Sequence, residues 1–120
     1  MNKVFIPGTE WLYYKIYCGS KTIDTILINE IIQLSSDLLN KKLIKKWFFI
    51  RYSDPDQHLR LRFHLGNCKD IGKVIILFNS HLSYYIDNNQ VWEVQLSSYI
   101  RELKRYGFNT IKQAELLFFY

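Results

Sequence analysis

The segment His58–Leu65 (HLRLRFHL) alternates polar and apolar residues over its whole length. Strict alternation matches the two-residue period of a β-strand, in which successive side chains point to opposite faces. The apolar residues are therefore expected to face a core that is covered by helices. The opposite face of the same strand is then formed by His58, Arg60, Arg62 and His64.

Apolar residues elsewhere in the chain recur with the periods of further strands and helices. Runs of aromatic and β-branched residues, or alternation, indicate strands at residues 11–18, 47–52 and 91–100. A helical period indicates helices at residues 22–40 and 71–85, and another helical pattern begins near residue 110.

These elements follow one another in the order of a split βαβ unit. The predicted fold class is α+β, a ferredoxin-like split βαβ arrangement with a four-stranded antiparallel sheet and the helices on one face. We see no internal repeat and no linker, so residues 1–120 are expected to form a single domain. The hydrophobic share of 48% and the charged share of 22% are ordinary globular values and exclude disorder by composition.

The opening residues contain no secretion signal, and no apolar run reaches the length of a membrane span. We therefore expect a cytoplasmic protein with reduced thiols. The two cysteines, Cys18 and Cys68, match no metal-binding spacing and are expected to fill space in the core or on the surface. We expect neither a metal nor an organic cofactor.

The formal net charge is +5, and the arginines are clustered rather than scattered. All of them lie within residues 51–62 and 101–105, whereas the lysines are spread along the chain. Arginine binds carboxylate and phosphate through two parallel hydrogen bonds, so clustered arginine indicates an anion site more strongly than clustered lysine does.

Strand periodicity predicts which residues share the helix-free face with these arginines. The first strand contributes Trp11, Tyr13, Lys15 and Tyr17, and the last strand contributes Glu93, Gln95, Tyr99 and Arg101. The other set of the last strand, Trp92, Val94, Leu96 and Ile100, is expected to face the helices. The helix-free face should thus be cationic and aromatic. For a generic strand, an ordinary solvated face would be the simpler interpretation.

Arg60 and Arg62 lie two residues apart on one strand, which brings their guanidinium groups within a few ångströms of each other. Like charges so close are costly unless an anion lies between them, and a ligand with one or two carboxylates would suit them. His58 and His64 flank the pair and are candidate substrate-binding residues, with Tyr99 and Arg101. Either histidine could serve as a general base, or simply cap the hairpin.

A second segment, RELKRYG at residues 101–107, places Glu102 and Arg105 three residues apart. On local grounds this is an ordinary surface ion pair.

In combination, however, the motifs resemble one protein family. They are Trp11, Ile16 and Tyr17, the block WFFIRYSDPDQHLRLRF at residues 47–63, RELKRYG, and AELLF at residues 114–118. Together they look like the C-terminal domain of lanthipeptide dehydratases and of related thiopeptide biosynthesis proteins.

The resemblance implies an elimination activity of the lyase type. In this family, a separate domain esterifies Ser or Thr of a precursor peptide with glutamate from glutamyl-tRNA. The C-terminal domain then expels the glutamate and leaves dehydroalanine or dehydrobutyrine. By motif match, Arg60 and Arg62 would hold the glutamyl group or stabilise developing charge, joined by Arg105. Glu102 would orient the arginines or take part in proton transfer.

The resemblance also implies that family domains continue past residue 120 and that a histidine from that later part joins their active site. We therefore expect this chain to be the N-terminal part of an elimination domain. Its expected partners are the glutamylated precursor peptide and the rest of the dehydratase or a glutamylation subunit. We expect no direct contact with nucleic acid.

Three alternatives remain open. Relatives that form pyridine rings in thiopeptides by cycloaddition share the fold, although that reaction has no glutamate to bind. A ferredoxin-like sheet with basic and aromatic residues on its open face could also bind RNA, although the glycine-containing RNA-binding pattern is missing. The third alternative is a non-catalytic chain that binds a peptide or docks on a partner subunit.

Overall fold

The computed structural model describes residues 3–53 and 56–101 of the chain. The elements in chain order are β1 (Lys3–Phe5), β2 (Trp11–Cys18), α1 (Ser20–Ile26), η1 (Leu27–Ile31), α2 (Ile32–Asn40), β3 (Ile44–Tyr52), β4 (His58–Leu65), η2 (Cys68–Asp70), α3 (Ile71–Asp87), β5 (Val91–Ser97) and β6 (Tyr99–Arg101). The helical pattern near residue 110 lies outside the described residues. No helix within the described ranges is both long and apolar enough to cross a membrane.

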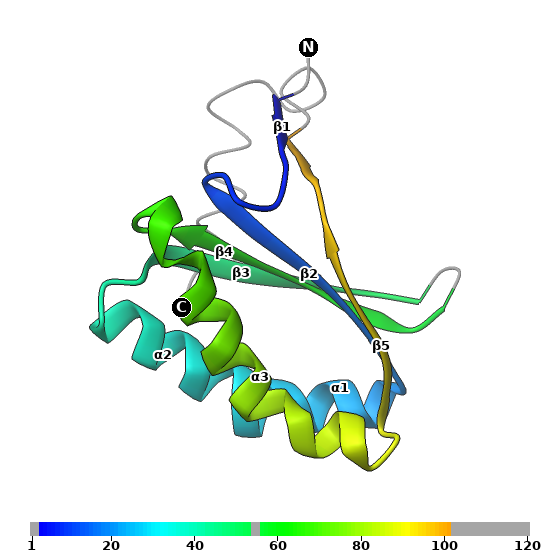
Figure 1. The fold of residues 1–120 in the computed structure, drawn as a ribbon. Coiled ribbons are helices and arrows are strands. Elements are labelled where there is room, and N and C mark those ends of the chain that lie inside the picture. The colour runs from blue at the N-terminus through cyan, green and yellow to red at the C-terminus, as the bar shows by residue number, and fades with distance from the viewer. Residues whose placement is uncertain (1–2, 54–55, 102–120) are drawn as a thin grey trace.

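Four strands form one antiparallel sheet in the order β3-β4-β2-β5. The helical segment between β2 and β3 joins strands that are separated by one other strand, and so does α3 between β4 and β5. This is the split βαβ arrangement. Figure 1 shows the helices together on one side of the sheet. The predicted ferredoxin-like α+β fold is confirmed.

The main core lies between this sheet and the helices. Leu59, Leu61 and Phe63 of β4 are fully buried in it, as the alternation of the strand predicts. The rings of Tyr14 and Phe78 stack with their centroids 3.8 Å apart and join β2 to α3. Because the apolar side of β4 is committed to this core, its arginine side must face away from the helices.

The helix predicted over residues 22–40 is continuous but contains one π turn, η1. Such a turn holds one residue more than an α turn, and it often marks a point where the helix meets a special packing demand. Glu30 lies within it and faces α3. Its carboxylate accepts hydrogen bonds from His81 Nδ1 at 2.9 Å and from the Tyr85 hydroxyl at 3.0 Å. The π turn therefore places a carboxylate between the two helical segments.

Both helical segments end at a non-glycine residue in the left-handed conformation, Lys42 with φ 61° and Asn89 with φ 59°. At the first end, the Leu43 N–H donates to the Leu38 carbonyl at 2.9 Å, and the Lys42 N–H donates to the Leu39 carbonyl at 3.0 Å. These two bonds are those of a Schellman motif, whose left-handed position is usually glycine because a Cβ is strained there.

A second, two-stranded sheet pairs β1 with β6 and sets Phe5 opposite Tyr99. The sequence pattern did not indicate β1, and its single strand over residues 91–100 is wrong. The chain leaves the main sheet after Ser97, and β6 pairs with β1 instead. The Tyr99 ring packs against those of Phe5 and Trp11, and the burial of these rings favours this change of direction. Figure 1 shows β1 beyond the end of the main sheet, away from the helices.

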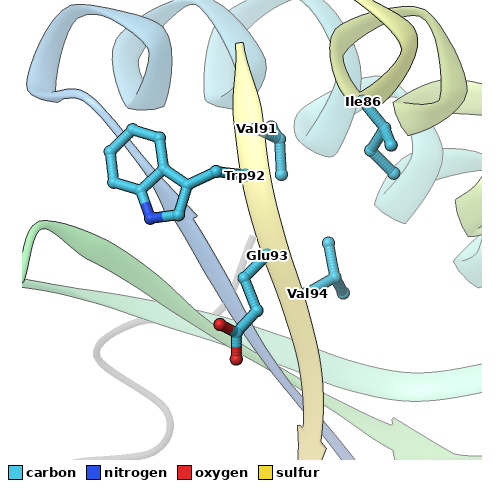
Figure 2. Close-up of a pocket in the computed structure, with 5 residues that line it drawn as sticks. All are labelled: Ile86, Val91, Trp92, Glu93 and Val94. Carbon is cyan, nitrogen blue, oxygen red and sulfur yellow. The ribbon is translucent and has the colours of Figure 1, made fainter. Parts of the chain in front are cut away.

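Trp92 does not face the helices, contrary to the sequence prediction. In the pairing of β5 with β2, Val91 lies opposite Cys18, whereas Glu93 lies opposite the residue that precedes Cys18, so Trp92 is an extra residue in β5. This is a β-bulge, which re-aims the side chain at that position. Figure 2 shows Trp92 and Glu93 on one side of β5 and Val91 and Val94 on the other.

Candidate functional site

The face of the main sheet that points away from the helices carries the predicted arginines, and we call it the arginine face. Side chains of the four strands stand in rows across it. Each row lists one residue per strand in the order β5, β2, β4 and β3. The first three rows are Glu93, Tyr17, His58 and Tyr52; Gln95, Lys15, Arg60 and Ile50; and Ser97, Tyr13, Arg62 and Phe48. A fourth row has no β5 residue and consists of Trp11, His64 and Lys46. The predicted assignment of β2 and β4 side chains to this face is confirmed.

Arg62 is the most buried charge of the arginine face, with only 9% of its surface exposed. Its Cζ lies 4.5 Å from the centroid of the Tyr13 ring, 5.2 Å from that of Phe48 and 4.7 Å from that of Tyr99. Among the described residues, no acceptor bonds to its buried Nε and no carboxylate pairs with its guanidinium group. A buried cation without an anion is costly, so this surrounding is suited to receive one.

An aromatic cluster surrounds Arg62 and belongs to a second, smaller core. It consists of Phe5, Trp11, Tyr13, Phe48 and Tyr99. The Trp11 ring meets Phe48 edge-on with centroids 5.6 Å apart and Tyr99 with centroids 5.1 Å apart. Because these rings are buried against one another, they offer no open platform on which nucleotide bases could stack. The members of this cluster are therefore occupied in packing.

Arg60 is held by different partners at the other end of the arginine face. Its Cζ lies 3.6 Å from the centroid of the Tyr52 ring, and its Nε donates a hydrogen bond of 3.0 Å to His58 Nε2. His58 is 1% exposed, and its Nδ1 lies 2.8 Å from the carbonyl oxygen of Asp56. The ring of His58 also stacks on that of Tyr17, with centroids 4.7 Å apart. Arg60 is thus fixed by its neighbours before any ligand binds.

The other predicted site residues are placed less centrally. His64 contacts the Trp11 ring, and its Nε2 lies 3.7 Å from a carboxylate oxygen of Glu10. Tyr99 is one of the rings around Arg62, and Arg101 is the last residue of β6. Their contact with a substrate stays a prediction.

Glu102 and Arg105 lie outside the described residues, so the predicted roles of this pair stay predictions as well.

Arg51 belongs to the same sequence cluster but not to the arginine face. It pairs with Leu59, whose side chain is in the main core, and therefore points to the helix side of the sheet. Its guanidinium group forms an ion pair with Asp24 and donates to the carbonyl and hydroxyl oxygens of Ser20, each at 3.1 Å. Arg51 joins β3 to α1 and is already neutralised.

Sequence reasoning did not single out Phe48 and Tyr52, which are the β3 residues that hold the two arginines. The signal was present, because Phe48, Ile50 and Tyr52 are spaced two apart and thus share one face of the strand. Phe5 could not have been found in this way, since it reaches the aromatic cluster through the pairing of β1 with β6.

Both cysteines are free thiols, with Cys18 buried and Cys68 exposed. Burial raises the pKa of the Cys18 thiol to about 11, and the nearby positive charge of Arg51 lowers it by less. A thiol with a raised pKa is a poor nucleophile at neutral pH. Across the described residues, no three His, Cys, Asp or Glu side chains come together in an arrangement that could hold a metal ion.

A small hollow of about 190 Å³ lies at the outer edge of the sheet, between β5 and the end of α3. Ile86, Val91, Trp92, Glu93 and Val94 line it (Figure 2). Its lining is apolar apart from the Glu93 carboxylate, which would repel an anion. The arginine face is therefore the better candidate for binding an anionic ligand.

The fold is a ferredoxin-like α+β domain, and one face of its main sheet carries Arg60 and Arg62 among packed aromatic rings. The chain belongs to the family described as "Lantibiotic biosynthesis dehydratase C-term", whose model matches residues 11–120. The family expected from the sequence motifs is thereby confirmed.

Relatives of known description are consistent with this membership. The chain is 28% identical to the subtilin biosynthesis protein SpaB of Bacillus subtilis over 98% of its length, and 30% identical to the nisin biosynthesis protein NisB of Lactococcus lactis subsp. lactis over 94%. It is also similar to the crystal structure of the tRNA dependent lantibiotic dehydratase MibB from Microbispora sp. 107891. That similarity has a TM-score of 0.76 and 27% identity over 92% of this chain. The chain spans 11% of the length of each of these proteins.

Proposed function

We propose that this chain provides the arginine face of a glutamate-eliminating domain in lanthipeptide biosynthesis. The substrate would be a precursor peptide whose Ser or Thr carries a glutamyl ester, and the product would contain dehydroalanine or dehydrobutyrine. The observation that carries the proposal is Arg62, a nearly buried guanidinium group whose Nε has no partner. A glutamyl group would supply a carboxylate, which none of the described residues provides to Arg62.

The elimination reaction develops negative charge at two positions, and cationic groups can stabilise each of them. A base removes the proton from Cα of the esterified residue, and negative charge builds up on the neighbouring carbonyl oxygen. The electron pair then forms the double bond between Cα and Cβ, the bond from Cβ to the ester oxygen breaks, and glutamate leaves as a carboxylate. Fixed donors in a partly dry site stabilise both charges without having to reorganise. Arg60 and Arg62 would provide them.

The remaining assignments belong to the same proposal. Arg105 would join the two arginines, and Glu102 would orient them or take part in proton transfer. The partners would be the precursor peptide and the rest of a dehydratase or a glutamylation subunit, all within the cytoplasm. The cycloaddition alternative receives less support, because its substrate has no glutamate to neutralise Arg62.

The experiment is to incubate the chain with a synthetic peptide that carries one glutamyl-Ser ester and to follow the peptide mass. Binding of the same peptide and of its unmodified form is measured by calorimetry. The proposal predicts preference for the glutamylated peptide, and any loss of glutamate from it should depend on the same two arginines. Arg60→Ala and Arg62→Ala should abolish both effects.

Arg51→Ala is the matched control, because it removes an equal charge from the other side of the sheet and should change neither readout. Equal affinity of the folded chain for the two peptides would contradict the proposal.

A further inference from the structure

His58 lies on the arginine face but is 1% exposed, so its ring is enclosed by the protein itself. The ring of Tyr17 stacks on it with centroids 4.7 Å apart, and that of Tyr52 lies tilted beside it at 5.5 Å. A base must reach the proton that it removes. An enclosed ring whose nitrogens are both engaged is poorly placed for this task.

The two nitrogens of His58 have partners that determine its protonation state. Nδ1 faces the carbonyl oxygen of Asp56 at 2.8 Å, and a carbonyl only accepts, so Nδ1 must carry a hydrogen. Nε2 faces the Nε–H of Arg60 at 3.0 Å, and arginine only donates, so Nε2 must be bare. The ring is therefore a neutral imidazole in the Nδ1–H form.

This bond decides how Arg60 can hold a ligand. A guanidinium group can bind a carboxylate through Nε and one Nη, or through both Nη groups. Nε of Arg60 is already bonded to His58, and the guanidinium group lies over the Tyr52 ring with Cζ 3.6 Å from the centroid. Only the edge formed by the two Nη groups remains for an anion.

We propose that His58 is a positioning residue, which as a neutral acceptor fixes Arg60 so that its two Nη groups are presented to the carboxylate. The part that concerns the ligand rests on the proposed function, whereas the tautomer and the bond to Arg60 do not. Tyr17 and Tyr52 hold the imidazole ring from either side, and Asp56 sets its tautomer.

The first test needs no ligand. In the ¹⁵N-labelled chain, NMR should show His58 with a hydrogen on Nδ1 and none on Nε2. A scalar coupling should connect Nε2 to Arg60 Nε across the hydrogen bond. A hydrogen on Nε2, or no coupling with Arg60 Nε in a folded sample, would overturn the proposal.

The second test uses a matched pair of variants and L-glutamate as the probe. In His58→Gln the amide oxygen can take the place of Nε2 and accept from Arg60, whereas in His58→Asn the amide reaches only the place of Nδ1. Loss of a hydrogen bond to a charged group should weaken glutamate binding about tenfold in His58→Asn. His58→Gln should stay within about threefold of the unaltered chain.

Equal losses in the two folded variants would show that His58 only fills space and would overturn the positioning role. If the unaltered chain binds no glutamate, the proposed function fails at this site, and the NMR experiment still decides whether His58 fixes Arg60.

Discussion

Replacement of Arg62 by methionine tests whether this arginine is kept for a ligand rather than for stability. Its buried Nε has no partner among residues 3–53 and 56–101, and an unpaired group of this kind costs the folded state about 1–3 kcal/mol. The three ring contacts offset this cost, by about 0.5–1 kcal/mol each at an exposed site and by more at a buried one, and the cost of burying the guanidinium charge opposes them. Methionine has no polar group to leave unpaired and makes favourable contacts between its sulfur and aromatic rings. We therefore expect Arg62→Met to change the free energy of unfolding by about 1 kcal/mol or less.

The assay is urea denaturation followed by fluorescence, which the buried tryptophans Trp11 and Trp47 make possible. It is combined with thermal melts in the presence and absence of glutamate. Glutamate at about 100 times its dissociation constant should stabilise the unaltered chain by about 2.7 kcal/mol and leave Arg62→Met unaffected. Arg51→Met is the control, because its exposed ion pair is worth about 1 kcal/mol or less and its loss should leave the response to glutamate intact.

A loss of more than about 3 kcal/mol in Arg62→Met would refute this reasoning, since removal of one partner from a buried ion pair has an effect of that size. Arg62 would then be a structural residue with a partner of its own. A response of Arg62→Met to glutamate equal to that of the unaltered chain would refute the assignment of the ligand.

Three further predictions concern the fold. Because burial raises the pKa of Cys18 to about 11 from an ordinary value of 9.0, its thiolate is scarce below that pH. Iodoacetamide at pH 8 should therefore label Cys18 at least about 100-fold more slowly in the folded than in the unfolded chain. Mass spectrometry can follow the labelling, and the exposed Cys68 should be labelled in both states. Gly66→Ala would place a Cβ 2.7 Å from the backbone oxygen of Lys42, and we expect denaturation to show a loss of about 1–3 kcal/mol; unchanged stability would contradict the tight approach. Lys42→Gly should raise the free energy of unfolding by about 1 kcal/mol because it relieves the left-handed conformation, and a destabilised variant would show that the lysine side chain matters more than the backbone.

Local periodicity predicted the parts of this structure that depend on neighbouring residues. The alternation of His58–Leu65 assigned Arg60 and Arg62 to the helix-free face, and the structure confirms it. The two-residue period does not carry through an inserted residue, and for this reason it failed at Trp92.

The surroundings of the arginines depend on pairing between distant segments, which no local pattern contains. Arg51 belongs to the same sequence cluster as Arg60 and Arg62, and only the register of β3 shows that it lies on the helix side. The aromatic cluster around Arg62 includes Phe5 and Tyr99, which come together when β1 pairs with β6. With three residues, β1 is too short to show the alternation of a strand in the sequence. The bond between His58 and Arg60 follows from side-chain conformations, which sequence spacing does not fix.

The short sheet of β1 and β6 has a consequence for the order in which the chain folds. Phe5 pairs with Tyr99, so its contacts close a loop that spans nearly all of the described chain. Closing so long a loop is entropically costly, and contacts of this kind form late, after the more local β3–β4 hairpin and the helices have assembled. During synthesis, a nascent chain that has just released Ser97 can already build the main core but still leaves Arg62 uncovered. Among the described residues, we therefore expect the aromatic cover of Arg62 to form last, in a docking step that the stability of the main core does not report.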